Sequence, residues 1–137
     1  LYSFMVAGGL IGSAAFGYLS DRFPKRLLLA GLLLVFSLSS FALTFPLSIV
    51  MLPVVLMVIG LTIFGTVPAI QATISNLAGP DLRDAFLGIY FTFDFVTLGL
   101  GPMIMGSIID SIGFNWMFYA ISILALFSSF LSLSFRE

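Results

Sequence analysis

The chain has few charged side chains and lacks two residue types altogether. Only 8% of its 137 residues are charged and 61% are hydrophobic, whereas about a quarter of a typical soluble domain is charged. It contains no cysteine and no histidine, which excludes disulfides, thiol nucleophiles, imidazole metal ligands and Ser-His-Asp catalysis. A net charge of −1 gives no basic surface for nucleic acid. We therefore expect a membrane protein that uses no metal and no cofactor.

Long apolar runs lie between the few charges. A transmembrane helix needs about 20 mostly apolar residues, and charges near its centre are disfavoured. Pro46 divides the longest run, because proline removes a backbone donor and disfavours helix at the preceding residue. The runs do not alternate with polar residues as the strands of a membrane barrel would. The sequence predicts one transmembrane domain with five spans, at residues 1–19, 27–45, 47–70, 85–109 and 115–135.

The cations are distributed asymmetrically along the predicted spans. Arg22, Lys25 and Arg26 follow the first span, Arg83 follows the third and Arg136 follows the fifth. All of them fall on one side, which the positive-inside rule identifies as cytoplasmic. We expect a multi-pass protein of the plasma membrane, with the N-terminus of this chain outside and its C-terminus in the cytoplasm. The odd number of spans and the abrupt apolar start predict a piece of a larger protein.

The most specific motif is the segment GYLSDRFPKR at residues 17–26. A tight turn joins two helices here, and Pro24 suits the first turn of the second helix. Asp21 lies at the C-terminal end of its own helix, where the helix dipole disfavours an anion, so we expect it to have a partner. Lys25 and Arg26 lie where the dipole disfavours cations, so we expect them to set the topology and to contact anionic lipid.

This segment resembles the signature loop of the major facilitator superfamily, G-x-x-x-D-R-x-G-[RK]-[RK]. Pro24 stands where the family has a glycine, and the positions that match are Gly17, Asp21, Arg22, Lys25 and Arg26. The resemblance implies that the loop joins the second and third helices of a six-helix half. It also implies that the aspartate locks the two halves together on the cytoplasmic side of the outward-facing transporter. Without the resemblance, the same residues are consistent with a plain basic anchor.

The fourth predicted span carries small residues that resemble the family's antiporter motif, G-x8-G-x3-G-P-x2-G-G. Thr97 and Met105 occupy two of its glycine positions, and the positions that match are Gly88, Gly101, Pro102 and Gly106. Small residues let helices pack closely in lipid, and the Gly-Pro pair permits a bend. Two interpretations are open, a packing face with a kink and a marker of antiport.

Asp94 is the one charged residue well inside a predicted span. It lies roughly 13 Å along the helix from residue 85, at 1.5 Å per residue. An ionisable residue within the membrane indicates function by default. Because removal from water disfavours the charged carboxylate, Asp94 could take up a proton on one side and release it on the other. It could instead meet cationic cargo, pair structurally with a cation on another helix, or lie beside a water-filled vestibule.

The remaining spans differ in their polar residues. Thr62, Thr66 and Thr73 share one face of the third span, with Gln71 near its end. The resemblance places this helix along a central cavity, which implies that these four residues line it. Alternatively, the threonines bond back to carbonyls of their own helix.

The first span has small residues four positions apart, among them Gly8 and Gly12, which suit either a moving interface between halves or a static packing face. The second and fifth spans carry only neutral polar residues and are expected to be outer, lipid-facing helices.

The predicted fold is that of an all-α membrane protein, a polytopic transmembrane helix bundle that forms half of a major facilitator-type fold. The spans match helices two to six of a half. We favour the C-terminal half, because the third span lacks the arginine usual in the other half and the chain ends in a short tail, Arg136-Glu137.

The function that the resemblance implies is secondary active transport of a small molecule by alternating access. Asp94 adds the hypothesis that this transport is coupled to protons. The expected partners are the substrate, membrane lipid and the missing half of the same transporter. The alternative is a non-transporting membrane receptor or scaffold with the same fold. A membrane enzyme would need paired acids, histidine or cysteine at depth, and Asp94 alone is not sufficient.

Overall fold

The computed structural model describes residues 1–134, and these form four α-helices without any strand. Each helix is long and apolar enough to cross a membrane. Residue 135, which ends the fifth predicted span, and the charges at Arg136 and Glu137 lie outside the described residues. The helices are α1 (Tyr2–Ser20), α2 (Lys25–Ala42), α3 (Met51–Ile112) and α4 (Phe114–Ser134).

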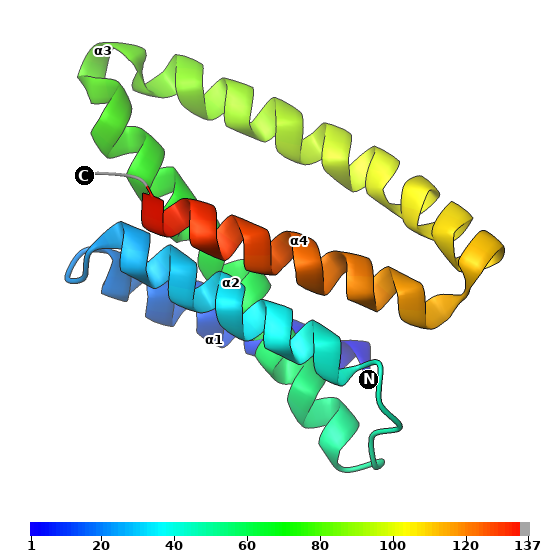
Figure 1. The fold of residues 1–137 in the computed structure, drawn as a ribbon. Coiled ribbons are helices and arrows are strands. Elements are labelled where there is room, and N and C mark those ends of the chain that lie inside the picture. Colours follow the sequence, from blue (N-terminus) through cyan, green and yellow to red (C-terminus); the bar gives the residue numbers. More distant parts are fainter. Residues whose placement is uncertain (135–137) are drawn as a thin grey trace.

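Helix α3 is folded back on itself at Gly79. Its 62 residues would extend roughly 93 Å as a straight helix, whereas the hydrocarbon core of a bilayer is about 30 Å thick. Gly79 has φ 68° and ψ 174°, and Pro80 starts the next helical turn, where no N–H donor is needed. We call residues 51–79 the first arm and residues 80–112 the second arm (Figure 1). The fourth predicted span, 85–109, falls within the second arm, whereas the third, 47–70, begins four residues before α3, which starts at Met51.

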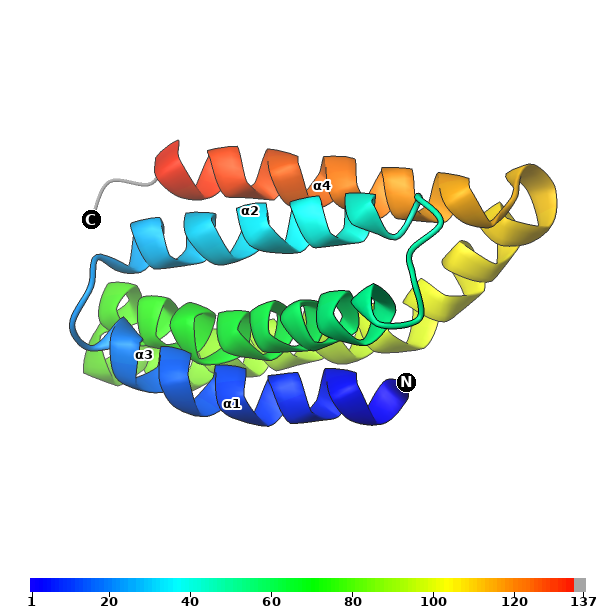
Figure 2. The same ribbon diagram turned by 90° about the horizontal axis from the view of Figure 1, so that it is seen from below.

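The chain runs along the bundle five times, counting the two arms of α3 separately. Figure 2 shows α2 and α4 in one layer and α1 and α3 in the other. The α1–α2 connection and the α3 bend lie at one end, whereas the N-terminus, the α2–α3 connection and the α3–α4 turn lie at the opposite end (Figures 1 and 2). Arg22 in the first connection, Lys25 at the start of α2 and Arg83 beside the bend are therefore at the same end of the bundle.

Glycines bring α1 and the first arm of α3 into backbone contact. A Cβ placed on Gly8 would overlap the Met57 carbonyl, and one on Gly12 would overlap the Leu61 carbonyl. Close approach through small residues is how membrane helices pack where lipid supplies no hydrophobic drive. Of the two interpretations of the α1 glycines, the structure therefore favours a packing face inside this bundle.

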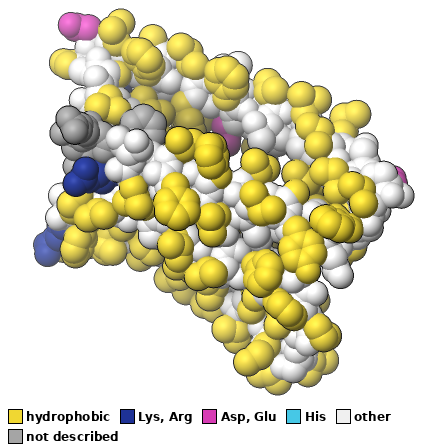
Figure 3. Space-filling view, in the orientation of Figure 1, with side chains coloured by type: hydrophobic (Ala, Val, Ile, Leu, Met, Phe, Trp, Pro, Cys, Tyr) yellow, Lys and Arg dark blue, Asp and Glu magenta, His cyan; other side chains and the backbone are white. Residues whose placement is uncertain are grey.

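The surface is more apolar than the interior. The buried hydrophobic residues are few and mostly small, whereas large side chains such as Phe93 and Phe95 are about 70% exposed. Figure 3 shows hydrophobic side chains across most of one face, with Lys and Arg gathered at one end. Water would not solvate a contiguous apolar surface of this extent, but lipid does. The buried hydrophobic residues are Ala30, Leu32, Ile59, Ala69 and Ala125.

Candidate functional site

The signature loop forms a short, hydrogen-bonded turn between α1 and α2. Asp21 is the C-cap of α1, and the N–H groups of Arg22 and Phe23 both donate to the Leu19 carbonyl at 3.0 Å. The Arg22 guanidinium lies 4.5 Å from the centre of the Tyr18 ring, a cation–π contact. Local bonds in α1 therefore fix the entrance to the turn.

Pro24 precedes α2 instead of standing in its first turn, and Gly17 is not in close contact with another helix. Pro24 occupies the N-cap position, with φ −55° and ψ 118°, and α2 begins at Lys25. The carbonyl of Pro24 accepts the first bonds of α2, from Leu27 and Leu28. Proline is suited to this position because its ring fixes φ near the observed value. A Cβ on Gly17 would lie 4.0 Å from the Pro68 side chain, an ordinary van der Waals distance. Close helix contact therefore does not require a glycine at position 17.

Asp21 is exposed at the end of α1. Among residues 1–134, no ion pair involves it and no group of three metal-ligating side chains occurs. The described part of this chain therefore supplies no group that would stabilise the Asp21 carboxylate against the helix dipole. Its role as a gate remains a prediction.

A cavity of about 700 Å³ lies at the basic end of the bundle. Three helices surround it, namely α2, the first arm of α3, and α4, and Phe23 of the α1–α2 turn closes one side. Two cations are among its lining residues, and most of the others are apolar. The described lining residues are Phe23, Lys25, Arg26, Leu29, Leu33, Ile70, Thr73, Asn76, Leu77, Ser128, Leu131 and Ser132.

The three threonines of the first arm donate to their own helix. Thr62 is only 1% exposed and donates to the carbonyls of Val58 and Ile59, at 3.0 and 2.9 Å. Thr66 donates to Ile63 and Thr73 donates to Ala69, at 2.6 and 2.8 Å. Each hydroxyl proton is thus used locally, although oxygen lone pairs remain for a ligand.

Thr73 lines the 700 Å³ cavity. Thr66 and Gln71 are half-buried on the same arm. Their contact with a substrate remains a prediction.

The second arm of α3 carries the remaining predicted site residues on an open helix. Asp94 is exposed, and nothing lies within 4 Å of a Cβ placed on Gly88, Gly101 or Gly106. The backbone stays helical through Pro102, since Gly79 is the one non-helical residue inside α3. The break in this region is therefore at Gly79 and not at the Gly-Pro pair.

The sequence interpretation missed a serine network between α2 and α4. The Ser37 hydroxyl donates to the Ser122 carbonyl at 2.7 Å, and the Ser129 hydroxyl donates to the Ala30 carbonyl at 2.8 Å. The Ser132 hydroxyl donates across the same interface. The three-residue spacing of Ser129 and Ser132 places these two donors on one face of α4, and it was the signal that could have indicated the pairing.

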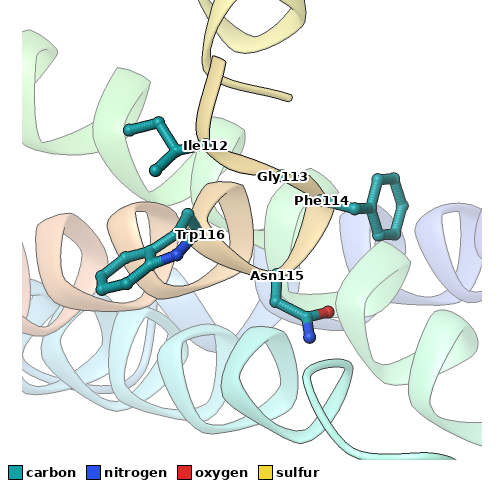
Figure 4. A pocket seen from close by; sticks show the side chains of 5 residues that line it. All are labelled: Ile112, Gly113, Phe114, Asn115 and Trp116. Atoms are coloured by element: carbon teal, nitrogen blue, oxygen red, sulfur yellow. The ribbon is translucent and has the colours of Figure 1, made fainter. Parts of the chain in front are cut away.

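A second, smaller cavity of about 290 Å³ lies at the α3–α4 turn. Its lining runs from Ile112 to Trp116, five consecutive residues, so it is the inside of the turn and not a gap between helices. Figure 4 shows Ile112 and Trp116 projecting to one side of the turn and Phe114 to the other. Trp116 contacts Tyr119 edge-on. These aromatic residues lie at the end opposite the basic turn, as in an interfacial belt.

These observations define the class of the protein, a polytopic membrane protein built of apolar helices whose large side chains are exposed. The family model of the Major Facilitator Superfamily matches residues 1–137, the whole chain. The chain belongs to the major facilitator superfamily, a family of membrane transporters and not of enzymes.

Relatives among known proteins are also transporters by name. A multidrug efflux pump named Tap from Mycobacterium tuberculosis is 26% identical over 121 residues, which is 87% of this chain and 28% of the pump. A benzoate transport protein from Acinetobacter baylyi is 31% identical over 99 residues, which is 72% of this chain and 21% of the relative. The chain thus spans less than a third of the length of these relatives. No solved structure matches the chain significantly.

Proposed function

We propose that the complete protein is a secondary active transporter that moves a small molecule by alternating access. Residues 1–137 supply five helices of one of its two halves. The family and the relatives support transport, since one relative is named as a multidrug efflux pump and another as a benzoate transport protein. The remaining length of those relatives is enough for the second half.

The proposal rests on the difference between glycines that lie against a neighbouring helix and glycines that have no neighbour within 4 Å. Gly8 and Gly12 are buried against the backbone of the first arm, whereas Gly88 and Gly101 on the second arm meet nothing within 4 Å. Open glycine positions on a membrane helix are suited to close contact with another helix. The second arm therefore faces the rest of the transporter, at the boundary where substrate would pass.

Asp94 lies on the same side of the second arm as Gly101. It is seven residues, about two helical turns, from Gly101, so the two positions point to the same side of the arm. A carboxyl group at this boundary would exchange protons with either side as the halves move, which couples a pH gradient to substrate movement. We propose proton coupling at Asp94 on this basis.

Proteoliposomes that contain the complete protein test the proposal. Uptake of a fluorescent organic cation and of benzoate is measured with and without an imposed pH gradient. We expect Asp94→Asn to abolish the response to the gradient, and Asp110→Asn, the same change at the exposed end of the same arm, to preserve it. Undiminished coupling in Asp94→Asn contradicts the coupling role. Ligand binding without any flux by the unchanged protein contradicts transport and favours a receptor or scaffold.

Asp21 provides a second test of the same proposal. Its carboxylate is exposed at a helix C-terminus, where the dipole disfavours it, so we propose that a cation or a helix N-terminus of the other half stabilises it. Asp21→Asn should slow substrate transport, whereas Asp81→Asn, at the same end of the bundle and in the first turn of the second arm, should not. Equal rates for the two variants would remove the gating role.

A further inference from the structure

The cavity at the basic end of the bundle has the arrangement of a head-group site. Lys25 and Arg26 are at one end of its α2 wall, and Leu29 and Leu33 continue the wall toward the centre of the bundle. From Lys25 to Leu33 the wall extends roughly 12 Å along the helix, at 1.5 Å per residue. Positive charge and apolar surface are therefore separated along one cavity, as the head and the chains of a phospholipid are.

The cavity is open to the surface that faces lipid. Leu77 is 72% exposed and Leu131 is 49% exposed, and both belong to its lining. Its volume of about 700 Å³ lies within the range of about 300–1,000 Å³ typical of ligand sites. An amphiphile could enter laterally from the bilayer without passing through water.

The charges of the cavity select the sign of its ligand. Lys25 is half-buried, and no acid occurs among the described lining residues. Asn76 adds a neutral amide to the same lining, and this amide can donate to a phosphate oxygen. The hydroxyl protons of Thr73 and Ser132 are already used, by the carbonyls of Ala69 and Arg26. A basic pocket between transmembrane helices at the membrane surface is characteristic of anionic lipid binding.

We propose that this cavity binds one anionic phospholipid, with its phosphate at Lys25 and Asn76 and its upper acyl chains along Leu29, Leu33 and Ile70. The site is distinct from the substrate pathway proposed for the second arm of α3, because that arm contributes no described residue to the cavity. Bound lipid would bridge α2, the first arm and α4, and so couple the composition of the membrane to the packing of these helices.

Native mass spectrometry of the complete protein in detergent tests the proposal. The protein is titrated with dioleoylphosphatidylglycerol, with dioleoylphosphatidylcholine of the same chain length, and with inorganic phosphate. We expect one phosphatidylglycerol to be retained in preference to phosphatidylcholine, and inorganic phosphate not to compete. Equal retention of the two lipids, or full competition by inorganic phosphate, would overturn the proposal.

Single substitutions test where on the protein the phospholipid binds. Lys25→Gln should weaken phosphatidylglycerol binding about fivefold, the effect of one cation near a membrane surface. Arg83→Gln removes a cation at the same end of the bundle but outside the cavity, and should leave binding unchanged. Leu33→Trp, which fills the apolar part of the cavity, should also weaken binding. Leu29→Ser is a second variant for the same test if the Leu33→Trp protein does not fold.

Two results would contradict the proposal. A loss of binding in Arg83→Gln equal to that in Lys25→Gln would indicate a general attraction between the basic end and the anionic lipid. Tighter binding after deletion of residues 135–137 would indicate that the chain's own C-terminus occupies the cavity.

Discussion

Gly60 of α3 lies directly against the main chain of Met5 of α1, so that a Cβ at position 60 would overlap the Met5 carbonyl. The contact complements those of Gly8 and Gly12 from the opposite helix, which meet the main chain of Met57 and Leu61. Small residues on both helices thus let two backbones touch over several turns. In lipid, this close packing and the dispersion contacts it permits are the main source of helix association.

Gly60→Ala should therefore destabilise the protein. The added methyl group forces the two helices apart, at a cost of about 1–3 kcal/mol, typical of overpacking. The measurement is the free energy of unfolding in detergent, obtained by titration with a denaturing detergent. Gly31→Ala is the matched control, because it lies in α2 with nothing within 4 Å and should gain up to about 1 kcal/mol from helix propensity. A Gly60→Ala protein as stable as Gly31→Ala would contradict the described contact.

Gly79→Ala should also destabilise the protein, for a different reason. With φ 68° and ψ 174°, Gly79 occupies a region of backbone space that is open essentially to glycine alone, and strain of this kind costs about 1–3 kcal/mol. No neighbour lies within 4 Å of a Cβ there, so crowding does not contribute. Gly99→Ala, a helical position equally free of neighbours, serves as the control in the same unfolding assay. If both variants unfold alike, the bend is not where the structure places it.

Ser37→Ala and Ser129→Ala should each weaken the α2–α4 pair. Each removes a buried hydrogen bond between helices, and such bonds contribute about 0.6 kcal/mol on average and up to about 1.7 kcal/mol in membrane proteins. Ser128→Ala is the control, since its hydroxyl is exposed and donates to Leu124 of its own helix. Losses of stability confined to the first two variants support the network. A loss in Ser128→Ala as large as in Ser129→Ala would contradict it.

The all-helical fold and the apolar character of its helices could be predicted from the sequence because lipid leaves few choices. A backbone in hydrocarbon must satisfy its hydrogen bonds within each segment, so apolar runs between charges become helices. The positive-inside rule assigned Lys25 and Arg83 to one side. The structure places both residues at the same end of the bundle. These inferences need no knowledge of the neighbouring helices.

Helix ends were harder to predict than helices. The third span was expected to end at residue 70, whereas the first arm of α3 continues to Gly79. Gln71, Thr73 and Asn76 lower the hydropathy there, but they do not prevent helix formation. Hydropathy reports where the hydrocarbon core ends, and a helix can continue past that point until its backbone is broken.

Which small residues meet a neighbour could not be predicted from one sequence. Gly12 and Gly101 are the same residue type within apolar helical runs, yet one is covered by α3 and the other is open. The serine contacts of α2 with α4 likewise depend on which helices are adjacent. The candidate site was therefore predictable as a set of residues, but its division into packed and open faces required the fold.

Labelling of single cysteines tests the central claim that five helices cross the membrane with their basic connections on one side. The chain has no cysteine, so each introduced thiol is unique in this segment of the complete protein when its other segments are made cysteine-free. Phe23→Cys and Leu82→Cys mark the basic end, and Ser48→Cys and Asn115→Cys mark the other. With a membrane-impermeant maleimide on intact cells, we predict labelling of positions 48 and 115 at once and of positions 23 and 82 only after permeabilisation. Labelling of positions 23 and 82 from opposite sides would contradict the account.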